Sequence, residues 1–371
     1  MAVLTDMDIA ANQGLALGER FGATSRAQHA QSVFAQCERN DVNGQDRLFE
    51  RRDHKLHLAS YLIKCKMTFI ESMRRLTMGH GNWSARDWEA YAARSVHGRS
   101  RSELFGARGM DAAYDPMRIG IRESRDSADN PDSTPIIIGV DVTGSMGMLA
   151  EELVVRGLNE TFTMLMDRRP VSDPHVMAMA IGDAYCDRAP LQVTQFEADL
   201  RIVEQLRQLW LEGGGGGNEG ESYCLAHVFA GLKTEHDAME KRRRKGFLFT
   251  VGDEPVLDGV ERDQLARVLG IDAQRGVSGR EAVKLASAGY EVFHIIVDGS
   301  YAARNMRKVR ASWEAILPER VIHLKDPARL AETIVATIEF ASGRHARATS
   351  GLASLLPEPL RRLPWAGLGR I

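Results

Sequence analysis

The sequence has little cysteine, and its four cysteines lie far apart. Cys37, Cys65, Cys186 and Cys224 include no CxxC pair, so nothing supports a zinc knuckle or a thioredoxin-like site. Scattered cysteines in a chain of 371 residues are more typical of reduced thiols than of a disulfide framework. The cysteine content therefore favours a cytoplasmic protein.

Long apolar runs and a large excess of one charge are also missing. The longest apolar runs are strand-sized, such as residues 135–140, whereas about 20 residues are needed to span a bilayer. Asp6, Asp8 and Asn12 stand where a signal peptide would have its basic and apolar segments. The formal net charge is only −2, which gives no general attraction to nucleic acid or acidic lipid. We therefore expect neither a membrane nor a nucleic acid as a partner.

The remaining composition is that of an ordinary globular protein, with 44% hydrophobic and 26% charged residues. At roughly 150 residues per domain, the length suggests about two domains. We predict an N-terminal helical region and linker over residues 1–130, a main domain over 131–342, and a loosely ordered tail over 343–371.

The N-terminal region contains two predicted helices, at residues 48–77 and from Ser84 to Ala92. His54 and His57 have a spacing that metals use, but no nearby ligand accompanies them, so we interpret them as surface residues. Three methionines could pack on the main domain, which we favour, or form a second interface; they are Met67, Met73 and Met78. Residues 96–134 have the composition of a loop or linker.

The main domain alternates strand and helix patterns. Residues 135–141 (PIIIGVD) form a continuous apolar run, as expected for a strand buried on both faces of a parallel sheet. Five more strands are predicted at 175–181, 191–196, 247–251, 291–297 and 320–324, and helices at 146–166, 197–211, 221–244 and 327–341. Two short helices are predicted within 258–288. This order indicates an α/β fold with a doubly wound, mostly parallel six-stranded sheet of Rossmann-like type.

Three polar segments fall at the carboxyl edge of this sheet, where such folds bind ligands. Asp141, Thr143 and Ser145 follow the first strand and can present three oxygens to one cation, while Gly144 lets the chain turn closely. Asp253 follows the fourth strand. Oxygen ligands at this spacing suit a hard cation such as Mg²⁺, with Mn²⁺ or Ca²⁺ as alternatives.

The third polar segment is a glycine tract, Gly213–Gly217, followed by Asn218, Glu221 and Ser222 at a predicted helix start. No Gly-Lys-Ser/Thr follows the glycines, so the tract is not a P-loop. A glutamate in a first helical turn is also ordinary compensation of the helix dipole.

Together these segments resemble the metal-ion-dependent adhesion site (MIDAS) of von Willebrand factor A (VWA) domains. The resemblance covers residues 135–342 and rests on Asp-x-Thr-Gly-Ser, the glycine-rich second loop and Gly-Asp after the fourth strand. It implies that Asp141, Thr143 and Ser145 are first-loop ligands and that Asp253 is the third-loop carboxylate. Thr143 stands where the family usually has serine and keeps the hydroxyl.

The second loop departs from the family pattern, because no threonine occurs between Gly213 and Ser222. Asn218, Glu221 or Ser222 could take its place, and we slightly favour Glu221.

The resemblance implies a metal-dependent protein-binding module in which a partner carboxylate completes the coordination of the ion. Intracellular relatives often serve as adaptors, in some cases for AAA-type ATPases. A metal-dependent hydrolase or nuclease using the same residues is the rival, with Glu254 and Asp183 as the available bases. An accessory protein of a phage or mobile element is a third alternative.

Other candidate features have simpler interpretations. Asp183 and Asp187 follow the second strand and could line the site, but a polar hairpin explains them as well. The basic run Lys241–Lys245 fits compensation of a helix dipole better than a nucleic-acid contact. No Gly-x-Ser-x-Gly occurs, and Thr143 replaces the second aspartate that a haloacid-dehalogenase phosphotransferase requires.

Overall fold

A computed structural model of the chain describes residues 107–146, 149, 157–214 and 220–343. The chain divides into two compact units, residues 1–77 and 78–371, and all described residues lie in the second. Several predictions fall outside the described residues: the helices at 48–77 and 84–92, His54 and His57, the three methionines, Asn218, the tail after residue 343 and most of the first half of the helix at 146–166.

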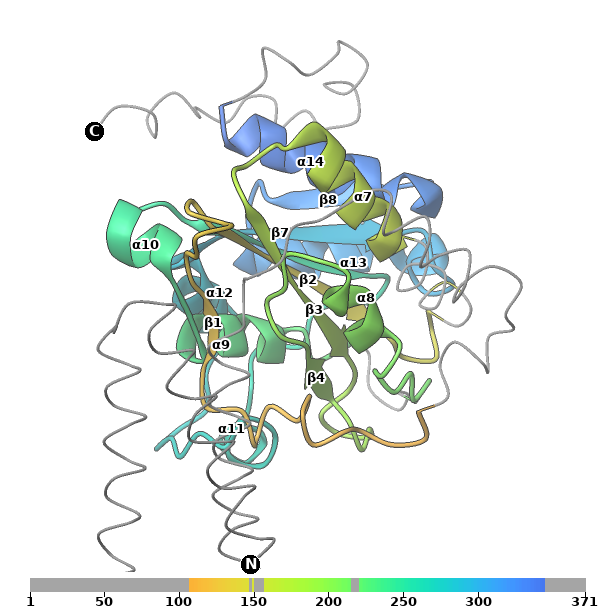
Figure 1. The fold of residues 1–371 in the computed structure, drawn as a ribbon. Coiled ribbons are helices and arrows are strands. Elements are labelled where there is room, and N and C mark those ends of the chain that lie inside the picture. Colours follow the sequence, from red (N-terminus) through yellow and green to blue (C-terminus); the bar gives the residue numbers. More distant parts are fainter. Residues whose placement is uncertain (1–106, 147–148, 150–156, 215–219, 344–371) are drawn as a thin grey trace, which may run out of the picture. The chain divides into compact units, whose positions relative to one another are not determined.

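The described residues form a six-stranded sheet in the order β4-β3-β2-β6-β7-β8. All neighbouring strands are parallel except the antiparallel pair β3–β4. The strands are β2 (Thr134–Asp141), β3 (Pro174–Ile181), β4 (Leu191–Val193), β6 (Gly246–Gly252), β7 (Tyr290–Val297) and β8 (Val321–Leu324). The predicted mostly parallel six-stranded α/β sheet is thus confirmed (Figure 1).

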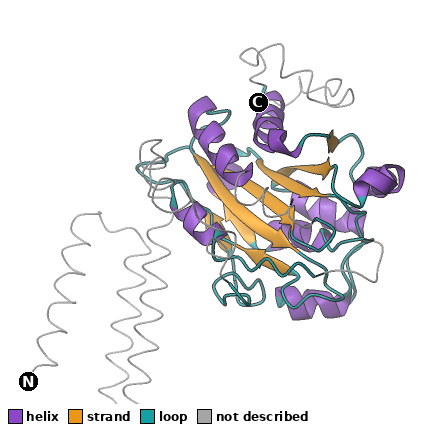
Figure 2. Ribbon diagram, turned by 90° about the vertical axis from the view of Figure 1, so that its right-hand side faces the viewer, coloured by secondary structure: helices purple, strands orange, loops and turns teal. Residues whose placement is uncertain are grey.

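Helices cover both faces of the sheet (Figure 2). One face packs against α7 (Leu158–Arg168), α8 (Arg201–Leu206) and α14 (Leu330–Ala341), which follows the short helix η2 (Pro327–Arg329). The other packs against α9 (Cys224–Leu232), α11 (Arg262–Leu269), α12 (Gly279–Ser287) and α13 (Ala302–Ile316). Ile136 and Ile138 enter the first core and Ile137 the second, which is why β2 is apolar throughout. No helix of the described ranges is both long and apolar enough to cross a membrane.

The prediction of one continuous helix over residues 221–244 is wrong. The structure has two helices there, α9 and α10 (Asp237–Arg242), with the strand β5 (Thr234–His236) between them. The Thr234 hydroxyl donates to the Ala230 carbonyl at the end of α9, and the His236 ring accepts from the Met239 backbone and caps α10. The predictions at 191–196 and 197–211 were too long, because only β4 and α8 form there.

β5 exists because the preceding linker supplies its partner. Residues 122–124, predicted as loop, form the strand β1 (Arg122–Ser124) and pair in parallel with β5. Tyr114 and Ile119 from the same stretch are buried, one in each core. This part of the linker is therefore packed on the sheet unit.

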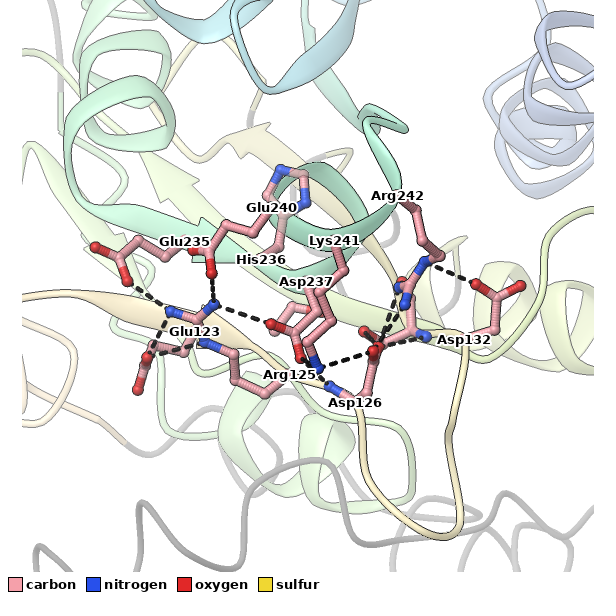
Figure 3. A network of polar contacts seen from close by, with 12 residues as sticks. Glu123, Arg125, Asp126, Asp132, Glu235, His236, Asp237, Glu240, Lys241 and Arg242 are labelled. Atoms are coloured by element: carbon pink, nitrogen blue, oxygen red, sulfur yellow. Dashed lines mark hydrogen bonds and ion pairs between the residues drawn. The ribbon is translucent and has the colours of Figure 1, made fainter. Parts of the chain in front are cut away.

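A network of ion pairs joins this linker to β5 and α10 (Figure 3). Arg125 bonds to Glu235, Asp237 and Glu240, at 2.6, 3.1 and 2.6 Å respectively. Asp126 accepts from Arg242 at 2.7 Å. Three members of the run Lys241–Lys245 pair with acidic residues of this linker, namely Lys241, Arg242 and Arg244, and Lys245 pairs with Glu291 on β7. This pairing agrees with a structural role for the run.

Candidate metal centre

The first and third predicted loops meet at the carboxyl edge of the central strands. β2 and β6 are adjacent and parallel, with Val140 beside Val251, so Asp141 and Asp253 leave the sheet side by side. Both aspartates are fully buried. The structure thus brings together two acidic residues that are 112 positions apart in the sequence.

A chain of oxygen atoms connects these two carboxylates. Thr143 donates through its backbone nitrogen (2.9 Å) and its hydroxyl (2.6 Å) to Asp141 Oδ1. The Thr143 and Ser145 hydroxyls lie 3.3 Å apart, and Ser145 Oγ is 3.1 Å from Asp253 Oδ1. In an octahedron with Mg–O distances of about 2.1 Å, neighbouring ligand oxygens are about 3.0 Å apart. The spacing in this loop therefore suits a small hard cation.

A fourth loop, after β7, completes the surroundings of Asp253. The Tyr301 backbone nitrogen donates to Asp253 Oδ2 at 2.8 Å, and the Ser300 hydroxyl donates to the Ser145 carbonyl at 2.6 Å. A Cβ on Gly299 would collide with Asp253 Oδ2, so the loop needs glycine there. Sequence reasoning missed this loop, since Asp298-Gly-Ser-Tyr301 resembles any polar turn.

The start of the glycine tract, Gly213 and Gly214, lies against the first loop. The Gly144 nitrogen donates to the Gly214 carbonyl at 2.6 Å. Glu221 is 2% exposed, and its Oε2 has no hydrogen-bond partner among the described residues. Ser222 instead accepts from the Ala184 backbone at 2.9 Å. Of the two second-loop candidates that the structure describes, Glu221 has the unsatisfied oxygen that a cation would use.

Asp183 and Asp187 form the polar turn that their sequence suggests, because the Asp187 nitrogen donates to the Asp183 carbonyl at 2.9 Å. However, Asp183 is fully buried and lies 3.4 Å from the Ser222 hydroxyl. Its carboxylate therefore adds to the negative charge around the site.

Five carboxylates gather at this edge, each at most 8% exposed: Asp141, Asp183, Glu221, Asp253 and Glu254. In the described ranges none of them forms an ion pair with lysine, arginine or histidine. Burial raises the pKa of Asp141 and of Asp253. Hydrogen bonds act in the opposite direction and lower these pKa values in part: Thr143 and Tyr223 donate to Asp141, and Tyr301 and Ser145 donate to Asp253. Burial, followed by the charges of Asp141, Glu254 and Asp183, raises the pKa of Glu221.

Buried negative charge without a basic partner is costly, and a divalent cation would offset it. The residues present therefore fit a divalent ion. The described residues include no group of three or more His, Cys, Asp or Glu side chains placed to hold a metal. The candidate site differs from such groups because two hydroxyls stand between two carboxylates.

Tyr223 is a functional candidate that the sequence reasoning missed. Its hydroxyl donates to Asp141 Oδ2 at 2.6 Å from the start of α9, and the side chain is fully buried. The only available signal was a tyrosine soon after the glycine tract, which a packing role explains equally well.

The sequence matches no protein-family profile and no curated protein. Similar solved structures include the open conformation of the pilus adhesin SpaC from Lactobacillus rhamnosus GG, at 11% identity and a TM-score of 0.41 over 60% of this chain and 31% of the adhesin. Proximal thread matrix protein 1 (PTMP1) from the mussel byssus is 11% identical, with a TM-score of 0.37 over 56% of this chain and 47% of that protein. The chain spans about a third and about half of these two proteins, and neither likeness bears on function.

Proposed function

We propose that residues 135–342 form a VWA-type domain that binds Mg²⁺ and uses the ion to bind a carboxylate of a protein partner. The observation that supports this most is the oxygen chain from Asp141 through Thr143 and Ser145 to Asp253, with spacings of 2.6, 3.3 and 3.1 Å. Asp141, Thr143, Ser145 and Asp253 are the residues that would hold the ion, and Glu221 is the second-loop candidate beside them.

An incoming carboxylate would bind to the ion itself, because the acidic side chains around it repel a carboxylate when no ion is bound. Two of the proposed ligands are neutral hydroxyls, which leave more of the ion's charge available than carboxylates would. When bound, the ion supplies a positive charge at an edge that is otherwise acidic. Partner binding would then depend on the ion, and the domain would act as a metal-dependent adaptor in the cytoplasm.

The test is a double substitution, Thr143→Ala with Ser145→Ala, compared with the wild-type chain in thermal unfolding with and without MgCl₂. At a Mg²⁺ concentration of about 100 times Kd, binding stabilises the folded state by roughly 2.7 kcal/mol, which is about 5–10 °C in Tm for a domain of this size. The double variant should lose this shift and keep the fold. Thr337→Ala removes a buried hydroxyl on α14 and should retain the shift.

A wild-type chain whose Tm does not respond to Mg²⁺, Mn²⁺ or Ca²⁺ would contradict the proposal. Partner binding is tested by co-purification under three conditions: in MgCl₂, in EDTA, and in EDTA followed by an excess of Mg²⁺. The partner should be released in EDTA alone. Phosphoester or phosphodiester hydrolysis that is lost in Asp141→Ala would instead favour the hydrolase or nuclease.

A further inference from the structure

Tyr223 bonds to the oxygen of Asp141 that makes no hydrogen bond with the first loop. Asp141 Oδ1 accepts both the backbone nitrogen and the hydroxyl of Thr143. Oδ2 accepts the Tyr223 hydroxyl at 2.6 Å. The two oxygens of this carboxylate are therefore held by separate segments, the loop after β2 and the start of α9.

The phenol is held rigidly by its neighbours. The Tyr223 ring packs edge-on against His294 at 5.3 Å and against Trp313 at 5.0 Å between centroids. Trp313 is in turn fixed by stacking on His294 at 3.4 Å and by a hydrogen bond from its indole nitrogen to the Glu254 carbonyl. All three rings are fully buried. Tyr223 therefore holds the Asp141 carboxylate in one orientation.

The backbone around the site makes room for this contact. A Cβ added to Gly252 would collide with the Tyr223 hydroxyl and would lie 2.9 Å from the Asp141 Cβ. The residue just before Asp253 thus has to be glycine for Tyr223 to reach Asp141. The backbone at Gly252 is therefore fitted to the contact between Tyr223 and Asp141, which incidental packing would not require.

We propose that Tyr223 is a positioning residue that restricts Asp141 to one oxygen towards the ion and makes the site prefer Mg²⁺ over Ca²⁺. This rests on the proposed function. Mg²⁺ requires six ligands in a near-ideal octahedron, whereas Ca²⁺ takes six to eight and readily accepts both oxygens of one carboxylate. Because Tyr223 anchors Oδ2 at the start of α9 while Thr143 holds Oδ1 in the first loop, the carboxylate cannot rotate to offer both oxygens to an ion beside the Thr143 and Ser145 hydroxyls. Removing the phenol would relax this restriction.

The experiment measures Mg²⁺ and Ca²⁺ affinities by titration calorimetry for the full chain and for Tyr223→Phe. Loss of a hydrogen-bonding partner behind a metal ligand typically lowers metal affinity 10–100-fold. We expect a loss of that size for Mg²⁺ and a smaller loss, or a gain, for Ca²⁺. The ratio of the two affinities should therefore shift towards Ca²⁺ by at least about 10-fold.

Tyr290→Phe is the matched control. Tyr290 is also buried, and its hydroxyl bonds to the Thr234 hydroxyl at 2.6 Å, but it lies at the opposite end of β7 from the site. This variant loses an equivalent buried hydrogen bond and should keep both affinities.

The outcomes separate the two proposals. Equal losses for Mg²⁺ and Ca²⁺ in Tyr223→Phe, or no loss for either, overturn the role of Tyr223 while the metal site stands. A wild-type chain that binds neither ion overturns the metal site itself.

Discussion

At the scale of single residues, the site depends on close approaches that a side chain would block. Gly144 was expected to allow a tight turn, and its nitrogen does bond to the neighbouring loop at Gly214. Gly252 has a different reason to be glycine, because it lies against the Tyr223 hydroxyl and the Asp141 Cβ. Its requirement comes from a residue 29 positions away in the sequence, so no local pattern reveals it.

Gly252→Ala should therefore damage both stability and metal binding. The added methyl group would push Tyr223 away from Asp141, and overpacking of this kind costs roughly 1–3 kcal/mol. Urea unfolding should show this loss in the free energy of unfolding, and calorimetry should show weaker Mg²⁺ binding. Gly120→Ala is the control, because its Cβ would meet no atom within 4 Å. Equal stability of the two variants would refute the steric argument.

At the scale of elements, β1, β5 and α10 hold one another in place. Each strand has only three residues, which is short for an independent pair. The Arg125 network adds ion pairs with Glu235, Asp237 and Glu240 across the three elements (Figure 3). Burial acts to raise the pKa of Asp126, but hydrogen bonds from Arg242 and Ser133 outweigh it and hold that pKa below its ordinary value. The segment before β2 is thus held by charge as well as by backbone pairing.

Arg125→Met should lower the free energy of unfolding by roughly 1–3 kcal/mol, because it leaves a carboxylate such as Asp237, whose side chain is 6% exposed, with fewer donors. The loss should become smaller at 1 M NaCl, where charges are screened. Arg275→Met is the control, since its pair with Glu281 is exposed to solvent and such pairs contribute little to stability. Chemical unfolding at low and high salt measures both effects. A loss in Arg125→Met no larger than in the control would show that the network is ordinary surface pairing.

At the scale of the whole molecule, two cores enclose the sheet and bury several histidines in neutral form. Burial lowers the pKa of His227 and of His236 to about 4 and that of His294 well below its ordinary value. Neither ring nitrogen of His227 has a hydrogen-bond partner among the described residues. A buried histidine with a lowered pKa stabilises the fold above its unfolded pKa of about 6.5 and loses that contribution as the pH falls towards its folded value.

His227→Phe should therefore make the stability less sensitive to acid. Between pH 6.5 and pH 4 the wild-type chain should lose up to about 1.4 kcal/mol per pH unit more than the variant, since only its unfolded state takes up a proton at this position. Urea unfolding at pH 7, 5.5 and 4.5 gives this difference. Buried carboxylates such as Glu197, whose pKa is raised to about 7 mainly by burial, titrate with the opposite sign, so only the difference between the two chains is informative. Parallel curves for the two chains would contradict the assignment.

The sequence by itself determined the sheet. Six strands followed from apolar runs whose continuity reflects burial on both faces, and the order of strands and helices gave the fold class. Asp141, Thr143, Ser145 and Asp253 could be found in the same way, because residues that follow parallel strands reach the same edge. These patterns lie within short segments of the sequence, so they can be recognised without knowing which distant segments come into contact.

Only the tertiary structure decided the remaining features. The division of 221–244 into α9, β5 and α10 depends on β1, more than 100 residues earlier in the chain. Tyr223 and the loop after β7 join the site through contacts between segments that no sequence period connects. Propensity describes what a segment prefers alone, whereas these features arise from hydrogen bonds and ring packing that exist only once the sheet has brought its loops together.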